Sequence, residues 1–282
     1  MQLDAGTFLL QLGAGGLLFC WVTTRRRQVS LGYGWLLRIV FGLLVLAGGL
    51  VLLADDHASA AIPALAAALA AAVAGGVSVA RRRSGVRGRI ELRAERKARV
   101  AAMIGTTAPD PAADGRGPEF PPALDIVAPV FGFAGLLAAS EFAGGPVALA
   151  AARLIVGAAF LGAVSDAMLL GHWYLVQPGL RRDALEELVI WTAALWPFEV
   201  AVFLWPTGVL QMFSGVVDDG YNGLLAWVWL VCALTTIGLV TMTWFALRER
   251  YYSAVMAATG LLYLAILTGF GMDLIPRAVL SP

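Results

Sequence analysis

The run LLRIVFGLLVLAGGLVLLA, from Leu36 to Ala54, decides the fold class of this chain. It holds one charged residue, Arg38, and it does not alternate between apolar and polar positions as a transmembrane β-strand would. About 20 apolar residues in an α-helix cross a hydrocarbon core of about 30 Å. A helix also pairs its own backbone N–H and C=O groups, which find no water in lipid. The run therefore predicts a transmembrane helix.

The whole chain has the composition of a membrane protein. Of its 282 residues, 60% are hydrophobic and 14% are charged, against about 25% charged in average soluble domains. Similar apolar runs recur along the sequence, which predicts an all-α, polytopic transmembrane bundle of eight helices. The expected spans are Ala5–Thr24, Trp35–Ala54, Ala58–Ala80, Pro122–Ala139, Pro146–Leu170, Ala184–Trp205, Leu224–Leu247 and Ala254–Asp273.

The basic residues predict an orientation. All but three of the 20 Lys and Arg residues lie in the segments 25–27, 81–121, 181–182 and 248–250, which follow every second span. The opposite loops carry acidic charges and no basic ones. Because Lys and Arg favour cytoplasmic loops, we expect both the N-terminus and the C-terminus outside. We expect a multi-pass protein of a cell membrane, and the many Ala, Gly and Arg residues favour a bacterial inner membrane.

The chain divides into three segments. Residues 1–80 form a three-helix transmembrane segment, 81–121 a cytoplasmic loop, and 122–282 a five-helix transmembrane segment. The first part of the loop, Arg81–Arg99, is basic and free of proline, so we expect it to continue the third helix. It fits a basic collar against anionic head groups or a docking arm for an acidic partner. The second part, Thr106–Pro122, is rich in Pro, Gly and Asp and is typical of a linker.

Charged residues inside the spans are the first candidates for a functional site. Ionisable groups are costly in a membrane, so by default they indicate function. Arg153 and Glu199 have matching depths on adjacent spans, which predicts an ion pair that either fixes helix register or lines a polar cavity. Arg38 and Asp166 also match in depth and form a second candidate pair.

Two further features accompany these pairs. Pro197 precedes Glu199 and can kink the helix beside that carboxylate. Asp273 and Arg277 are four residues apart near the outer end of the last span, where an i, i+4 ion pair at the interface explains them.

The triplet His172-Trp173-Tyr174 is a candidate ligand site at the inner interface. Gly171 before it and Pro178 after it predict that the fifth helix ends here. One interpretation is an aromatic belt, since Trp and Tyr favour this depth. The other is that His172 and Tyr174 hydrogen-bond a quinone, a lipid or a substrate head group near Asp166.

The sequence predicts no cofactor and no metal site. A bis-histidine haem is disfavoured, because His57 lies in an outer loop and His172 at the inner interface. Cys20 and Cys232 both lie inside apolar runs, with no metal-ligand spacing. The expected partners are the lipid bilayer and further membrane subunits, and no nucleic acid.

Two functions remain open at this level. The first is a non-catalytic, membrane-embedded subunit or scaffold of a larger complex, with a quinone or lipid site at the inner interface. The polarity-poor, Ala- and Gly-rich helices favour it. The alternative is a secondary transporter or permease for a small solute or protons, which would use the buried Arg, Glu and Asp set. An intramembrane enzyme has the least support, because no reactive constellation of residues emerges.

Overall fold

The computed structural model of the chain describes residues 4–104, 118–177, 180–206 and 208–280. In this part of the chain, eight spans are long and apolar enough to cross a membrane, and no strand occurs. The predicted all-α bundle of eight transmembrane helices is therefore confirmed. The helices are α1 (Ala5–Thr24), α2 (Leu31–Ala54), α3 (Ala58–Ala80), α5 (Val127–Ala139, preceded by the 3-10 turn η3, Pro122–Ile126), α6 (Val147–Val176), α7 (Asp183–Leu204), α9 (Leu224–Arg248) and α10 (Tyr252–Val279).

Several helices run past their predicted ends. α6 continues past the predicted Leu170 to Val176, so it ends between Gly171 and Pro178, as the sequence predicts. α10 continues to Val279 and includes Pro276. Within an apolar bundle these extensions keep backbone groups paired, which outweighs the weak helix preference of Gly.

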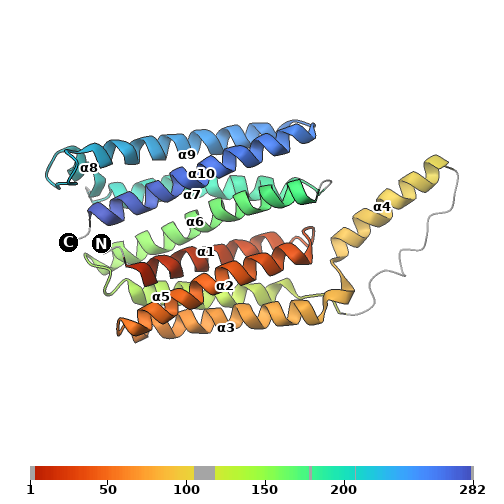
Figure 1. Ribbon diagram of the computed structural model, residues 1–282, viewed down its shortest axis with the longest axis horizontal. Coiled ribbons are helices and arrows are strands. Elements are labelled where there is room, and N and C mark those ends of the chain that lie inside the picture. Colours follow the sequence, from red (N-terminus) through yellow and green to blue (C-terminus); the bar gives the residue numbers. More distant parts are fainter. Residues whose placement is uncertain (1–3, 105–117, 178–179, 207, 281–282) are drawn as a thin grey trace.

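The spans lie alongside one another, and their loops gather at two ends (Figure 1). One end carries the arginine-bearing loops and the separate helix α4 (Arg87–Ile104), and the other carries both termini and the short helix α8 (Gly208–Phe213). The two termini thus lie at the same end, as an even number of spans requires. Which side of the membrane that end faces remains a prediction.

The basic helix after α3 does not continue α3. The short 3-10 turn η1 (Arg82–Ser84) and Gly85 separate α3 from α4. Gly85 has a φ of +66°, a left-handed conformation that glycine adopts without steric cost. The expectation of one continuous helix is therefore wrong, although Arg87–Ile104 is helical. The predicted linker Thr106–Pro122 lies mostly outside the described residues.

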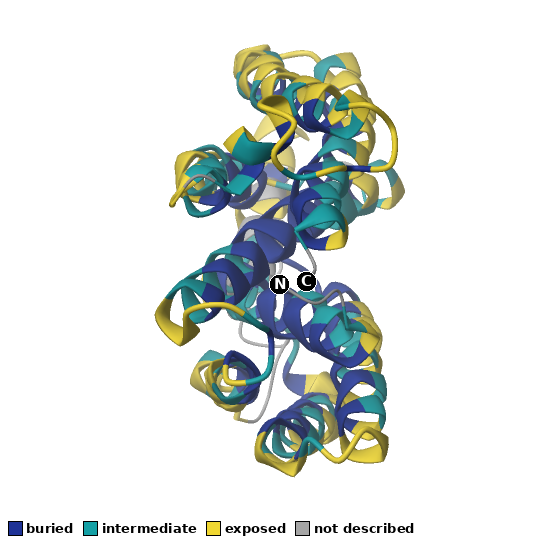
Figure 2. Ribbon diagram, turned by 90° about the vertical axis from the view of Figure 1, so that its left-hand side faces the viewer, coloured by how far each residue is buried: buried dark blue, intermediate teal, exposed yellow. Residues whose placement is uncertain are grey.

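Packing groups the helices differently from the order of the chain. α5 follows the long loop in sequence, yet it packs against α3 and α1, while α6 contacts α1, α7 and α10. Buried residues concentrate where the helices meet, and the outer faces are exposed (Figure 2). The bundle is thus two four-helix groups, α1–α2–α3–α5 and α6–α7–α9–α10, joined through α1 and α6.

Glycines allow the backbones of α1 and α6 to approach each other closely. A Cβ added to Gly15 would lie 1.8 Å from the backbone oxygen of Ala158. One added to Gly162 would lie 2.2 Å from the backbone carbon of Gly15. Small residues let membrane helices approach closely enough to gain dispersion energy. Backbone contact at Gly15 and Gly162 therefore sets the distance between the two groups.

Candidate functional site

A cluster of buried polar side chains lies where α1, α6, α7 and α10 meet. It comprises Gln11 of α1, Arg153 of α6, Glu199 of α7, and Asp273 and Arg277 of α10, and is called the polar cluster below. Gln11, Glu199 and Asp273 have no exposed surface, and the two arginines are 8% and 3% exposed. Polar groups from four helices meet here, inside a bundle whose surroundings are apolar. Such a concentration is costly in a membrane and marks a candidate site.

Asp273 accepts the most hydrogen bonds in the polar cluster. Arg277 Nε donates to Asp273 Oδ2 at 2.8 Å, and Arg277 Nη2 donates to Oδ1 at 2.7 Å. Gln11 Nε2 also donates to Oδ1, at 3.1 Å. The predicted i, i+4 pair of Asp273 and Arg277 is confirmed. Both side chains are buried between helices.

Gly157 lets the backbone of α6 approach these groups. A Cβ at this position would lie 2.3 Å from Gln11 Nε2 and 2.7 Å from Asp273 Oδ1. Nearby, Arg277 Nη2 donates to the backbone oxygen of Arg153 at 3.1 Å. A side chain at 157 would displace the polar groups, so glycine is part of how the polar cluster is assembled.

Arg153 and Glu199 do not form the predicted ion pair. Arg153 Nε donates to the backbone oxygen of Val202 at 2.8 Å, and Nη2 donates to that of Trp205 at 3.4 Å. These carbonyls lie at the C-terminal end of α7, where no later helical N–H can bond them. The Arg153 guanidinium therefore bonds the free carbonyl groups at the end of α7 in place of the Glu199 carboxylate. The two residues share the polar cluster, but the predicted pairing is wrong.

Glu199 is an acid without a donor. It is fully buried, and neither carboxyl oxygen has a hydrogen-bond partner. Its charged neighbours are Asp273 and Arg277 of α10. Pro197 lies inside α7 two residues earlier and removes one N–H from the helix. A buried carboxylate with no donor is strongly disfavoured, so Glu199 requires a proton, a cation or a ligand to balance it.

Arg38 and Asp166, the second predicted pair, do not bond each other either. Arg38 Nε donates to Asp125 Oδ1 and Nη2 donates to Oδ2, both at 2.7 Å. Thr24 Oγ1 adds a donor to Asp125 Oδ2 at 2.8 Å. A helical side chain points toward the start of its own helix, and the turn η3 places Asp125 at that end. The Arg38–Asp166 pairing is therefore wrong.

Asp166 is a second buried acid without a donor. It is fully buried in α6, and both side-chain oxygens lack a hydrogen-bond partner. Cys20 and Tyr33 are titratable groups close enough to interact with it electrostatically. The Tyr33 hydroxyl donates to the backbone oxygen of Asp166 at 3.2 Å, and not to its carboxyl group.

The residues of the triplet point to three different places. His172 is exposed, and its Nδ1 lies 3.1 Å from the hydroxyl of Tyr263. Trp173 Nε1 donates to Ser30 Oγ at 3.0 Å. The buried Tyr174 hydroxyl donates to the backbone oxygen of Arg181. Successive helical residues diverge around the axis, so the triplet does not converge on one pocket.

Two members of these sites were missed by the sequence reasoning. Gln11 is the only side-chain amide in the first span, which was a visible signal. Asp125 follows Pro121 and Pro122 at the start of the fourth span, where an acid beside the arginine-bearing end suggests a partner. Depth alone could not choose between Asp125 and Asp166 for Arg38, because that choice depends on which helices touch.

The site offers no metal ligand set in the described residues, where no group of three His, Cys, Asp or Glu side chains is placed to hold an ion. His57 stacks on Phe142 with ring centroids 3.7 Å apart, in the loop before α3, whereas His172 lies near the opposite end of α6. No protein-family model, curated protein or solved structure matches the chain. The fold defines the class, a multi-pass integral membrane protein, and the buried acids carry the functional argument.

Proposed function

We propose that this protein is a membrane proton transporter in which Glu199 carries the proton. The single observation behind the proposal is the fully buried Glu199 carboxyl group, which has no donor. Intramembrane carboxyl groups of this kind are typical of proton relays in pumps and transporters. When it is protonated, Glu199 can donate a hydrogen bond to the neighbouring Asp273 carboxylate, which would supply the partner that the Glu199 carboxyl group lacks.

The charges around Glu199 suit a carboxyl group that alternates between a protonated and a deprotonated state. Arg277 holds Asp273 in a bidentate ion pair, so Asp273 is already balanced when Glu199 is protonated. When Glu199 loses its proton, the positive charge of Arg277 is close enough to stabilise the Glu199 carboxylate. Only the proton moves in this step, from an aqueous donor to the Glu199 carboxylate and back to water on release.

Asp166 is a second proton-binding station on this hypothesis. It lies nine positions along α6 from Gly157, which borders Gln11, Asp273 and Arg277 of the polar cluster, or about 13 Å at 1.5 Å per residue. A proton cannot cross that distance in one hydrogen bond, so transport requires water or helix movement between the two acids. The kink site at Pro197 beside Glu199 is the structural element suited to such movement.

Proton flux into proteoliposomes tests this function. Full-length protein is reconstituted with an internal pH indicator, and flux is driven by an imposed membrane potential. We expect Glu199→Gln to lower the flux by about a hundredfold, as loss of a proton-transferring group typically does. Glu199→Asp should retain part of it. Glu187→Gln is the matched control, because Glu187 lies on α7 and bonds Arg25 and Arg26 at the other end.

Labelling by an apolar carbodiimide gives a second readout that needs no substrate. The reagent modifies protonated carboxyl groups in apolar surroundings, so Glu199 should be labelled and Asp273, held by Arg277, should not. Equal flux in wild type and Glu199→Gln, together with an unlabelled Glu199, contradicts the proposal.

A second candidate function, the membrane-embedded subunit, is favoured by a different observation. His172 and Tyr263 form a hydrogen-bonded pair that is exposed on the outer surface of α6 and α10, with Tyr263 43% exposed. Polar pairs on such a surface suit a neighbouring subunit or the head of a quinone or lipid. Affinity purification in a mild detergent tests it: a partner should co-purify with wild type and be lost in His172→Ala. A monodisperse single chain that supports flux would exclude it.

A further inference from the structure

Asp166 and the polar cluster lie on opposite sides of the contact between α1 and α6. The polar cluster borders α6 at Gly157, and the backbone contact with Gly15 of α1 follows at Gly162. Asp166 comes one turn after Gly162, toward the arginine-bearing end of the bundle (Figure 1). An added Cβ at Gly15 would overlap the backbone of α6, so the two helices leave no room for a side chain between them at this level. In this arrangement the junction blocks direct proton transfer between Asp166 and the polar cluster.

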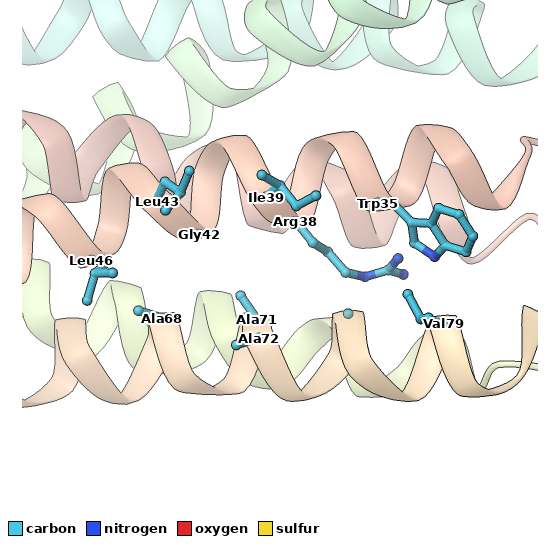
Figure 3. Close-up of a pocket in the computed structure, with 11 residues that line it drawn as sticks. Trp35, Arg38, Ile39, Gly42, Leu43, Leu46, Ala68, Ala71, Ala72 and Val79 are labelled. Atoms are coloured by element: carbon cyan, nitrogen blue, oxygen red, sulfur yellow. The ribbon is translucent and has the colours of Figure 1, made fainter.

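Arg38, the basic residue of α2, lies on the side of that helix that faces α3. Its side chain runs between α2 and α3, with the guanidinium toward Trp35 and Val79 (Figure 3). Nε and Nη2 both bond Asp125 at 2.7 Å. Asp166 is left with neither a hydrogen-bond donor nor an ion-pair partner among the described residues. A carboxyl group buried in this way is far more stable with a proton than without one.

Tyr33 connects Asp166 to the arginine-bearing end. It is the third residue of α2, which begins at Leu31 at that end of the bundle (Figure 1). Its side chain is fully buried, and its hydroxyl donates to the backbone oxygen of Asp166 at 3.2 Å. Asp166 itself lies ten positions before the end of α6 at Val176, which is about 15 Å of helix. The tyrosine side chain therefore starts near the helix ends and reaches the level of the buried acid.

Two further buried hydroxyl groups lie on this side of the α1–α6 contact. Ser165 precedes Asp166 on α6, and Thr23 of α1 comes one turn after Cys20, which is close enough to Asp166 to interact electrostatically. The side-chain oxygens of Ser165 and Thr23 are buried and have no partner in the described part of the chain. A hydroxyl group donates one hydrogen bond and accepts others, so it can pass a proton on. Groups of this kind therefore accompany Tyr33 on the arginine-bearing side of the contact.

We infer that Tyr33 is the relay through which Asp166 exchanges protons with the arginine-bearing end of the bundle. The Asp166 carboxyl group gives its proton to the Tyr33 oxygen, while the Tyr33 hydroxyl gives its own proton to a water molecule from that end. Tyr33 stays neutral, Asp166 becomes a carboxylate and the water becomes hydronium, and the reverse step reloads Asp166. Because the Tyr33 hydroxyl already bonds the backbone of Asp166, rotation of the Asp166 side chain is the movement that the step requires. The role of this route in transport rests on the proposed function of Glu199.

A second tyrosine makes the same kind of hydrogen bond and serves as the matched control. The Tyr252 hydroxyl donates to the backbone oxygen of Tyr174 at 3.4 Å, also on α6. That bond lies eight positions beyond Asp166, which is about 12 Å along the helix. Tyr252→Phe therefore removes an equivalent contact with α6 away from the buried acid. If the Tyr33 hydroxyl only held α2 against α6, Tyr33→Phe and Tyr252→Phe would have the same effect.

Hydrogen–deuterium exchange of the Asp166 carboxyl group tests the relay. The full-length protein in nanodiscs carries Glu199→Gln, which removes the Glu199 carboxyl signal. Infrared spectroscopy follows the C=O stretch of protonated carboxyl groups after transfer to D2O, and Asp166→Asn identifies the band of Asp166. We expect Tyr33→Phe to slow the exchange about a hundredfold, the usual effect of removing a positioned proton-transfer group. Tyr252→Phe should leave the exchange rate unchanged.

A third variant keeps the test independent of the stability of Tyr33→Phe. Tyr33→His restores a side chain that can both accept and donate a proton, so its exchange rate should lie between those of Tyr33→Phe and the parent protein. Equal exchange rates in Tyr33→Phe and Tyr252→Phe would overturn the inference. So would exchange in Tyr33→His as slow as in Tyr33→Phe, or an infrared spectrum in which Asp166→Asn removes no band of a protonated carboxyl group.

Proton flux in proteoliposomes separates this route from the proposed function. If Glu199→Gln leaves the flux at the wild-type level while Tyr33→Phe slows exchange at Asp166, the transport proposal fails and the Tyr33 route stands. If Glu199→Gln abolishes the flux while Tyr33→Phe changes neither flux nor exchange, the transport proposal stands and the Tyr33 route is overturned. Where both hold, Tyr33→Phe should lower the flux as well as the exchange rate.

Discussion

At the residue scale, the buried charges of the described residues include closely bonded ion pairs and carboxyl groups with no hydrogen-bond partner. Arg38 and Asp125 form a bidentate pair, and Phe120 stacks on the guanidinium with its ring centroid 4.5 Å away. Asp166 and Glu199 have no donor at all. A paired charge can hold helices together. An unpaired buried charge destabilises the bundle, so its presence indicates a functional role. This contrast separates structural from functional candidates.

The Arg38–Asp125 pair makes a prediction about stability. Arg38→Met leaves a buried carboxylate uncompensated, and we expect it to lower the free energy of unfolding by about 3–5 kcal/mol. Arg38→Met combined with Asp125→Leu removes both charges and should recover most of that loss. Denaturation midpoints in detergent measure the three proteins. Equal losses in the single and double variants would show that the pair contributes through packing alone.

A second residue-scale prediction concerns pH. Asp219, in the loop before α9, accepts from the backbone N–H groups of Tyr221, Gly223 and Leu225 at 2.8–2.9 Å. Burial tends to raise its pKa, but these hydrogen bonds outweigh that effect and lower the pKa below the ordinary value. Its stabilisation of the loop is therefore present above the unfolded pKa of about 3.9 and is lost as pH falls through the lower folded value.

Pepsin cleavage across acidic pH checks this loop. In wild type, we expect the segment 216–225 to resist cleavage near pH 4 and to become sensitive at lower pH, as Asp219 is protonated. Asp219→Asn should make cleavage independent of pH in this range. Asp218→Asn is the control, since Asp218 accepts a single hydrogen bond among the described residues, from Gly220. A wild-type pattern in Asp219→Asn would rule out Asp219 as the titrating group.

At the element scale, glycines decide how the helices meet. The contact of Gly15 with Gly162 joins the two four-helix groups, and Gly157 makes room for the polar cluster. In both places the glycine matters because backbone atoms or polar groups occupy the space of a side chain. Glycines on lipid-facing surfaces, such as Gly238 of α9, have no such neighbour.

The α1–α6 junction can be tested by adding one methyl group. Gly162→Ala places a Cβ against the backbone of Gly15, and overpacking of this kind costs about 1–3 kcal/mol. Gly238→Ala, which meets nothing within 4 Å, should cost nothing. Thermal unfolding of the purified proteins in detergent compares them. If Gly162→Ala is as stable as Gly238→Ala, the close approach does not limit packing.

At the scale of the whole molecule, the loops at the two ends differ in charge. The arginine-bearing loops gather at one end and the termini at the other (Figure 1). The positive-inside tendency then predicts that the termini face away from the cytoplasm. All loops at one end of the bundle lie on the same side of the membrane. One labelled loop at each end is therefore enough to determine the orientation.

Cysteine labelling of intact cells measures this orientation. In a background with Cys20 and Cys232 replaced by Ala, a membrane-impermeant maleimide should label Ser214→Cys and not Glu249→Cys. Both positions are exposed and lie at opposite ends of α9. Labelling after cell lysis controls for reactivity of the second site. The reverse pattern would place the termini in the cytoplasm.

The sequence by itself determined the number of spans and showed that basic loops follow every second one. Apolar length and the one-sided distribution of arginine are local properties, so the run from Leu36 to Ala54 and its counterparts could be identified without knowing which helices touch. The buried ionisable residues were visible for the same reason. Asp166 and Glu199 stand out in apolar sequence whatever their partners are.

Only the tertiary structure decided the partners. Arg38 bonds Asp125, and Arg153 bonds the end of α7, because side-chain direction and helix contacts govern the choice between groups of similar depth. Gln11 joins Asp273 across 262 positions of sequence through the α1–α6–α10 packing. Depth follows from counting residues along one helix, whereas pairing depends on the rotation and neighbours of several, which no single span encodes.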